Sequence, residues 1–179
     1  MSRRPRRFFA VLTFALALAP LGCRRPKPVQ IQQTEEEVPR LTSMIQMGDP
    51  KSEAQLVTGF YGIEQNVWRC TGQHFSAVLR PPFGAAQKGA TLQLAFTVPP
   101  VIIANLKTIS LSASVGSTSL SPETYTQPGE YVYKRDLTPA LLNSDAVRVD
   151  FSLDKSMPPS GADQRELGVV ATRLWLDPK

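Results

Sequence analysis

Short runs in which apolar and polar residues alternate constrain the fold of this chain more than any other feature. The clearest run is 90–98, and 108–115, 130–137 and 146–153 repeat the pattern. A period of two places apolar side chains on one face of a strand and polar side chains on the other. These runs therefore predict half-buried antiparallel strands.

Proline-rich segments separate the runs. Paired prolines follow two of them, at Pro81-Pro82 and Pro99-Pro100, and proline ends a strand because it cannot donate a hydrogen bond to the next strand. Two further strands are expected over 75–79 and from about Leu167 to Leu176. A single helical turn is expected over 138–143.

About seven short strands without an amphipathic helix among them are typical of an all-β domain. The predicted fold is a single antiparallel β-sandwich, of the jelly-roll or immunoglobulin-like kind, over residues 55–179. A range of this length supports one hydrophobic core and not two.

The first 22 residues have the layout of an export signal. Four arginines precede an apolar run from Phe8 to Leu21 that is too short for a membrane-spanning helix, and Gly22-Cys23 follow directly. Leu21-Gly22-Cys23 resembles the lipobox of bacterial lipoproteins, in which the cysteine carries the lipid. Pro20 departs from that pattern, and cleavage after Ala17-Leu18-Ala19 is the alternative. Whether the basic start directs Sec or twin-arginine export stays open.

The segment 23–54 is predicted to be a flexible tether. It has no aromatic residue and no sustained apolar period, so it cannot bury enough surface to offset the entropy of ordering it. The apolar residues within 38–47 also fit a short helix. The expected domain boundaries are therefore a signal over 1–22, a tether over 23–54 and a folded domain over 55–179.

The net charge of +5 does not indicate a nucleic-acid partner. Four of the twenty basic residues belong to the export signal, which leaves sixteen against fifteen acidic residues. The remaining charges alternate in sign along the chain, apart from Arg24, Arg25 and Lys27 next to the predicted lipid anchor. We therefore expect neither nucleic-acid binding nor a strongly basic surface.

The catalytic and metal-binding motifs are absent. His74 is the one histidine of the chain, which excludes a histidine-based metal cluster, and it follows Thr71-Gly72-Gln73 in an expected turn with its ring in solvent. No serine-hydrolase elbow, zinc-protease motif or phosphate-binding glycine loop is present. The sequence thus predicts no cofactor, no metal and no catalytic residue.

Carboxylates and arginines gather in two segments that are distant in sequence. Glu64 and Arg69 lie in the first, and Asp163, Arg165 and Glu166 lie in the second. Facing carboxylates could hydrolyse a glycan, but arginine neighbours lower a carboxyl pKa and so remove a general acid. The sequence favours a structural network of these five residues, in which an arginine ties the first strand to the loop before the last.

Three aromatic residues are candidates for stacking on a sugar ring, namely Trp68, Tyr131 and Tyr133. The two tyrosines share one strand face by the period of two. With Val132 directed inward, both would be exposed as a binding surface. The alternative for Trp68 is a place in the core.

Cys70 has no obvious partner. Lipidation of Cys23 would leave it unpaired, whereas cleavage upstream would allow a Cys23–Cys70 disulfide. A buried free thiol is the favoured interpretation.

A family resemblance rests on the order of these motifs. Gly59-Phe60-Tyr61 with Glu64, then Trp68-Arg69, then Pro158-x-x-Gly161-x-Asp163-x-Arg165-Glu166-Leu167-Gly168 resembles a largely uncharacterised β-sandwich domain of bacterial cell-surface proteins. That domain occurs in small exported lipoproteins and as an appendage of enzymes that build surface polysaccharide. Cys70 departs from the family, which has an aromatic residue there.

The resemblance implies a non-catalytic lipoprotein of the cell envelope, anchored in the membrane through Cys23. It would be lipid-anchored in the outer membrane, facing the periplasm or the cell surface. Its expected partners are envelope polysaccharide or another envelope protein. The alternatives are a purely structural envelope protein and a carboxylate-dependent glycan hydrolase.

Overall fold

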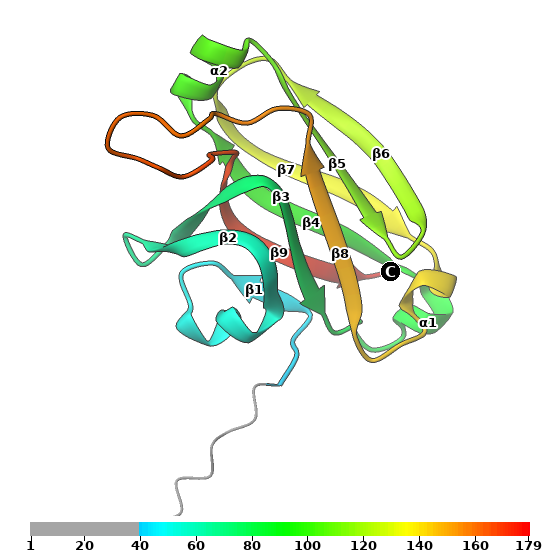
Figure 1. The fold of residues 1–179 in the computed structure, drawn as a ribbon. Coiled ribbons are helices and arrows are strands. Elements are labelled where there is room, and N and C mark those ends of the chain that lie inside the picture. Colours follow the sequence, from blue (N-terminus) through cyan, green and yellow to red (C-terminus); the bar gives the residue numbers. More distant parts are fainter. Residues whose placement is uncertain (1–39) are drawn as a thin grey trace, which may run out of the picture. The chain divides into compact units, whose positions relative to one another are not determined.

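The computed structural model describes residues 40–179, and over this range the all-β prediction is confirmed. The nine strands pair only in antiparallel fashion. They are β1 Met44–Gln46, β2 Leu56–Glu64, β3 Trp68–Leu79, β4 Ala90–Val98, β5 Ile109–Val115, β6 Thr118–Tyr125, β7 Gly129–Leu137, β8 Val147–Leu153 and β9 Val170–Pro178 (Figure 1). The helices are short: η1 Pro50–Gln55, α1 Ala85–Lys88, α2 Pro100–Leu106 and η2 Pro139–Leu142.

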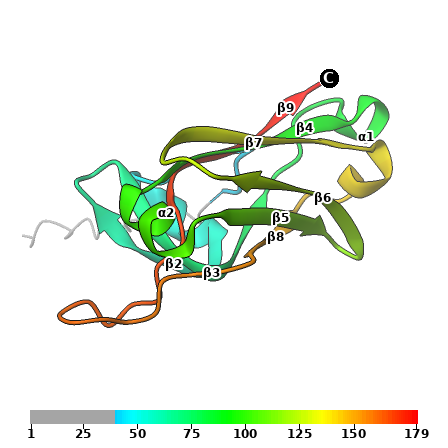
Figure 2. The ribbon, with the colours of Figure 1, turned by 90° about the horizontal axis from the view of Figure 1, so that it is seen from above.

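One long strand joins two layers into a sandwich. The strand order is β6-β5-β8-β3-β9-β4-β7, with β2 paired to β3 and β1 paired to β9. The start of β3, at Arg69 and Cys70, pairs with β9, whereas its later part from His74 to Leu79 pairs with β8. Figure 2 shows β4, β7 and β9 in one layer and β3, β5 and β8 in the other.

The core lies between the layers and follows the predicted alternation. In β4 the side chains of Leu92, Leu94 and Val98 are fully buried, and the inward residues of β5 and β8 are buried in the same way. The rings of Phe75 and Phe151 stack across the β3–β8 pair with centroids 5.0 Å apart. Burial of apolar surface on this scale is the main favourable contribution to folding.

The folded domain begins earlier than predicted within the described residues. Ile45 in β1 and Met47 just after it are buried at 1% and 0% exposure, and β1 pairs with β9. The side-chain amide of Gln55 also donates to the carbonyls of Val78 (2.8 Å) and Thr42 (3.0 Å). Residues 40–54 are therefore part of the domain and not a tether, and β1 lies where a short helix within 38–47 was the alternative. Three strand residues are too few to give a recognisable apolar period.

Two further local predictions differ from the structure. His74 lies within β3 and not in a turn, although its side chain is exposed as expected. Short helices α1 and α2 follow the paired prolines, where only loops were expected; the predicted helical turn is present as η2. Across residues 40–179 no helix is long and apolar enough to cross a membrane.

Candidate functional site

Arg165 is the centre of a charged cluster at one end of the sandwich. Its Nη1 lies 2.7 Å from Glu64 Oε1 on β2, and its Nε and Nη2 donate to the two carboxylate oxygens of Asp163 at 2.9 and 2.8 Å. The bidentate contact is thus within the loop, and Arg165 makes one bond from that loop to β2. The hydrogen bonds from Arg165 lower the pKa of Glu64 and lower that of Asp163 to about 2.

Arg69 does not join this cluster. It is buried at 3% exposure and donates through Nε to the Met47 carbonyl (3.1 Å) and through Nη1 to the Tyr61 carbonyl (3.0 Å). Its Nη2 lies 2.6 Å from a carboxylate oxygen of Glu53. Arg69 is therefore separate from the other four residues of the predicted network. The reason is that Arg69 points toward the segment 44–55, which the sequence had assigned to the tether.

Glu166 has its own partners. One carboxylate oxygen accepts from the Ser156 hydroxyl at 2.7 Å and the other from the backbone N–H of Gln73 at 3.2 Å, and these bonds lower the pKa of Glu166. The Tyr61 hydroxyl donates to the Glu166 carbonyl at 2.8 Å. A carboxylate with a lowered pKa is ionised at neutral pH, so it is poorly suited to act as a general acid.

The tyrosine prediction is wrong, because β7 presents its other face. Tyr133 is fully buried and Tyr131 is half-buried, whereas Val132 is 40% exposed. Both hydroxyls find carbonyl acceptors: Ser121 within β6 for Tyr133 (2.8 Å), and Gln127 between β6 and β7 for Tyr131 (2.9 Å). A tyrosine whose hydroxyl is satisfied can lie in a core.

Trp68 is half-buried and lies opposite Glu64 on β2, near the charged cluster. Trp68 and Tyr131 are thus the two members of the predicted stacking set that keep partial exposure, whereas Tyr133 keeps none.

Cys70 lies at an apolar pocket between α2 and the loop before β9. The pocket has a volume of 150 Å³ and is lined by Pro99, Val101, Ile102, Met157, Pro158, Leu167 and Val170 among others. Burial and the charge of Glu64 raise the pKa of the half-buried Cys70 thiol to about 11. It has no disulfide partner among residues 40–179, and Cys23 lies outside the described residues. A thiol of this kind is an inert packing group at neutral pH.

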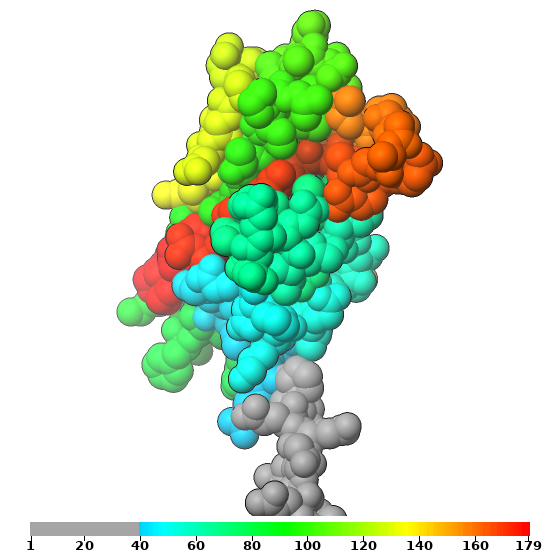
Figure 3. Space-filling model, turned by 90° about the vertical axis from the view of Figure 1, so that its left-hand side faces the viewer, coloured from blue at the N-terminus to red at the C-terminus, as the bar shows by residue number. Residues whose placement is uncertain are grey.

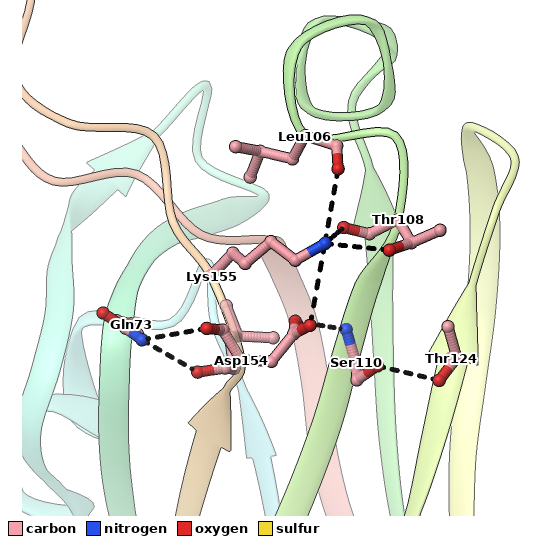
Figure 4. Close-up of polar contacts among 8 residues, drawn as sticks. Gln73, Leu106, Thr108, Ser110, Thr124, Asp154 and Lys155 are labelled. Atoms are coloured by element: carbon pink, nitrogen blue, oxygen red, sulfur yellow. Dashed lines mark hydrogen bonds and ion pairs between the residues drawn. The ribbon is translucent and has the colours of Figure 1, made fainter.

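A second polar cluster lies where β8 ends near α2 (Figure 4). The Lys155 ammonium donates to the carbonyls of Leu106 (3.3 Å) and Thr108 (3.1 Å) and to the Thr108 hydroxyl (2.9 Å). Asp154 accepts from the backbone N–H of Ser110 at 2.6 Å. Because these groups are all engaged with one another, the cluster fastens α2 to the sheet and offers little to a ligand.

The outer face of the layer β6-β5-β8-β3 carries rows of polar side chains. In one row Ser76, Asp150, Ser114 and Ser119 lie opposite one another across four strands. In the second, His74, Ser152 and Ser112 do so across three. Residues directly opposite in antiparallel strands project from the same face.

These rows line a groove with a volume of 410 Å³, which Thr58, Leu120 and Arg148 also border. Arg148 lies 2.7 Å from an Asp150 carboxylate oxygen and donates to the Ser76 hydroxyl at 3.2 Å. The His74 ring nitrogen Nδ1 is 3.0 Å from the Ser152 hydroxyl. Hydroxyl, imidazole and carboxylate groups can each accept, and all but the carboxylate can also donate, so the groove can hydrogen-bond a polyhydroxyl ligand.

The sequence analysis missed this groove. Its members are the polar alternate residues of strands that were predicted, but their juxtaposition depends on the register between four strands, which the apolar pattern does not give. In the described part of the chain no group of three or more His, Cys, Asp or Glu side chains could hold a metal ion.

Comparisons with known proteins give little further information. No family model matches the chain, and no curated protein matches it. A solved structure described as "CBM4 structure and function" shares 10% identity, with a TM-score of 0.34 over 76% of this chain and 85% of that chain. A likeness this slight carries no conclusion about the present chain.

Proposed function

We propose that this protein is a non-catalytic lipoprotein of the bacterial envelope whose β-sandwich binds polysaccharide in the groove across β6, β5, β8 and β3. The observation that carries the proposal is the pair of cross-strand polar rows, in which six hydrogen-bonding side chains on one outer face are at least partly exposed and the seventh, Ser76, is buried beneath them. Side chains that donate and accept hydrogen bonds in a row can contact successive hydroxyl groups of a polysaccharide.

The groove suits an extended ligand that binds weakly and along its length. It is open, crosses four strands and is lined by short side chains that lose little entropy on binding. Arg148 and Asp150 are engaged with each other at 2.7 Å, so they present a fixed pair of charges. A ligand with few charges and many hydroxyls fits such a surface better than an apolar or strongly ionic one.

The carboxylates weigh against the alternative of a glycan hydrolase. A retaining or inverting mechanism needs one carboxyl group with a raised pKa, whereas the pKa values of Glu64, Asp163 and Glu166 are all lowered. Their partners are Arg165, Ser156 and the backbone of Gln73, which suit a structural role.

The lipid anchor on Cys23 and the envelope location rest on the sequence of residues 1–23. Replacement of Cys23 by serine should abolish labelling of the protein by a radioactive fatty acid and move it from the membrane to the soluble fraction. Unchanged fractionation would contradict the anchor without affecting the groove.

The groove is tested by isothermal titration calorimetry with oligosaccharides released from envelope polysaccharide. Ser114→Ala and Asp150→Ala should each weaken binding, because each removes a hydrogen-bonding group from the longer row. The matched controls are Thr97→Ala and Lys134→Ala, on the outer face of the other layer, which should bind like the wild type. Binding that is lost in the controls but retained in the groove variants, or no binding of any fragment, would contradict the proposal.

A further inference from the structure

Phe83 stands at the tip of a loop with its side chain fully in solvent. Its exposure of 102% exceeds that of the other exposed large apolar residues within 40–179. Pro81 and Pro82 precede it, and Gly84 follows in a left-handed conformation (φ 81°). The turn is closed by the N–H of Ala85, which donates to the Pro82 carbonyl at 3.1 Å. The phenyl ring is therefore presented on a stiff loop, so little backbone entropy is lost if the ring binds something.

The loop lies beside the point where the chain enters the domain. The N–H of Arg80 donates to the Thr42 carbonyl at 3.0 Å, and Ser43 and Phe83 border the same hollow of 510 Å³. Figures 1 and 3 show the first described residues and α1, which follows the loop, toward one end of the domain, with α2 at the other. Thr42 and Ser43, near the start of the described range, therefore lie beside the Phe83 loop.

We propose that the Phe83 loop rests in the headgroup region of the phospholipid bilayer that holds the anchor, and so fixes which end of the sandwich faces the membrane. The inference rests on the proposed anchor at Cys23. A phenyl ring fits the boundary between headgroups and acyl chains. Arg80 and Lys88, which flank Phe83 in the sequence and are both exposed, can meet phosphate groups. Asp145 also borders the hollow, together with Leu142, Asn143 and Ser144.

The anchor makes so small a contact effective. One aromatic side chain cannot hold a protein on a membrane by itself, because stable attachment takes two signals. Eighteen residues lie between Cys23 and Thr42, and even a fully extended chain joins these two positions over at most about 68 Å. The loop is therefore held at a high effective concentration near the bilayer, where a weak contact suffices to orient the domain.

With the Phe83 end of the domain turned toward the membrane, the groove stays accessible to a ligand. The groove lies on an outer face of the sandwich, between strands that run from the Phe83 end to the α2 end. The polar rows cross these strands, so a polysaccharide that follows the rows would run roughly along the membrane surface rather than into it.

The test uses the full-length lipidated protein in vesicles of phosphatidylethanolamine and phosphatidylglycerol with brominated acyl chains, which quench tryptophan only on close approach. Phe83→Trp should add an emission, relative to wild type, that shifts to the blue and is quenched by the brominated lipid. Val101→Trp is the matched control, because Val101 is also exposed (53%) and lies on α2 at the other end; its added emission should not be quenched. Both sites are exposed, so neither change disturbs the core.

Hydrogen exchange gives a second readout. The backbone amides of segment 80–88 should exchange more slowly in the vesicle-bound lipidated protein than in the unlipidated Cys23→Ser protein in solution. Phe83→Asp should remove this protection. Vesicle-bound protein in which Trp at position 83 stays unquenched would overturn the inference while leaving the anchor intact. Failure of the lipidated protein to bind vesicles at all would overturn the anchor and this inference together, without bearing on the groove.

Discussion

Replacement of Arg69 by methionine removes the most deeply buried charge in the described part of the chain. Methionine keeps most of the aliphatic stem, so the change removes the guanidinium group and leaves the packing largely filled. Three contacts are lost: the bonds to the carbonyls of Met47 and Tyr61 and the ion pair with Glu53.

The structure indicates how the cost divides among these contacts. Glu53 is 71% exposed, so its ion pair is screened by water and contributes no more than about 1 kcal/mol. The Met47 carbonyl bond is buried, and a buried acceptor without a donor costs about 1–3 kcal/mol. With both carbonyls left unpaired, Arg69→Met should lower the free energy of unfolding by about 3–5 kcal/mol.

Chemical unfolding by urea, followed by tryptophan fluorescence, measures this difference directly. Glu53→Gln is the control, because it removes only the ion pair, and it should shift the free energy by no more than about 1 kcal/mol. If Glu53→Gln were as destabilising as Arg69→Met, the ion pair and not the carbonyl bonds would hold β1 and β2 together. If Arg69→Met unfolded like the wild type, the buried guanidinium would contribute nothing to the fold.

Three further outcomes follow from single groups. The rate at which iodoacetamide alkylates Cys70 should rise with a midpoint near pH 11 in the folded protein and near 8.5 in urea, about the ordinary cysteine pKa; a folded-state midpoint near 8.5 would contradict the burial of this thiol. The Tyr125 hydroxyl is buried without a hydrogen-bond partner among the described residues, so Tyr125→Phe should stabilise the protein by about 1 kcal/mol in thermal unfolding, and a loss of stability would reveal a missed partner. The pKa of Asp163 is lowered to about 2, so its contribution to stability is present above its ordinary pKa and is lost as the pH falls through about 2; Asp163→Asn should therefore flatten the acid limb of the stability curve, and an unchanged limb would contradict this.

The strands were predictable because each carries its own signal. The alternation over 90–98 and 146–153 marks which side chains are buried without any knowledge of the neighbouring strands. β1 gave no such signal, since a strand of three residues contains one inward side chain, Ile45. Its place in the sheet depends on pairing with β9, a partner about 130 residues away in sequence.

The face that β7 buries could not be predicted from the alternating pattern alone. A period of two fixes that Tyr131 and Tyr133 share a face, but it does not say which face is buried. The apolar Val132 suggested the wrong answer. The tyrosines could face inward because Ser121 and Gln127 offer carbonyl acceptors at the margin of the core, and those acceptors come from the neighbouring loop and strand, not from β7.

The charged motifs illustrate the same limit. Arg165, Glu64 and Asp163 do meet in space, but the contacts of Arg69 were assigned to the wrong partners. An arginine can donate hydrogen bonds to any nearby oxygen. Arg69 donates to two main-chain carbonyls, and no sequence motif marks those acceptors. Residue identity thus predicts that a buried arginine will be paired, whereas its partners depend on the backbone that surrounds it.

Closure of the sandwich edge explains how the proposed groove can stay open and fixed. β6 and β7 end the strand order, and Arg135 on β7 bridges them by donating to the carbonyls of Ser121 (2.7 Å) and Pro122 (3.1 Å) on β6. Pro122 has no N–H to donate to another strand, and Arg135 already binds the carbonyls of Ser121 and Pro122. Both features hinder the pairing of another chain with this edge. The Arg135 side chain thus holds β6 along the edge that is turned toward β7. The outer face of β6, which carries Ser119 of the longer polar row, remains available to a ligand.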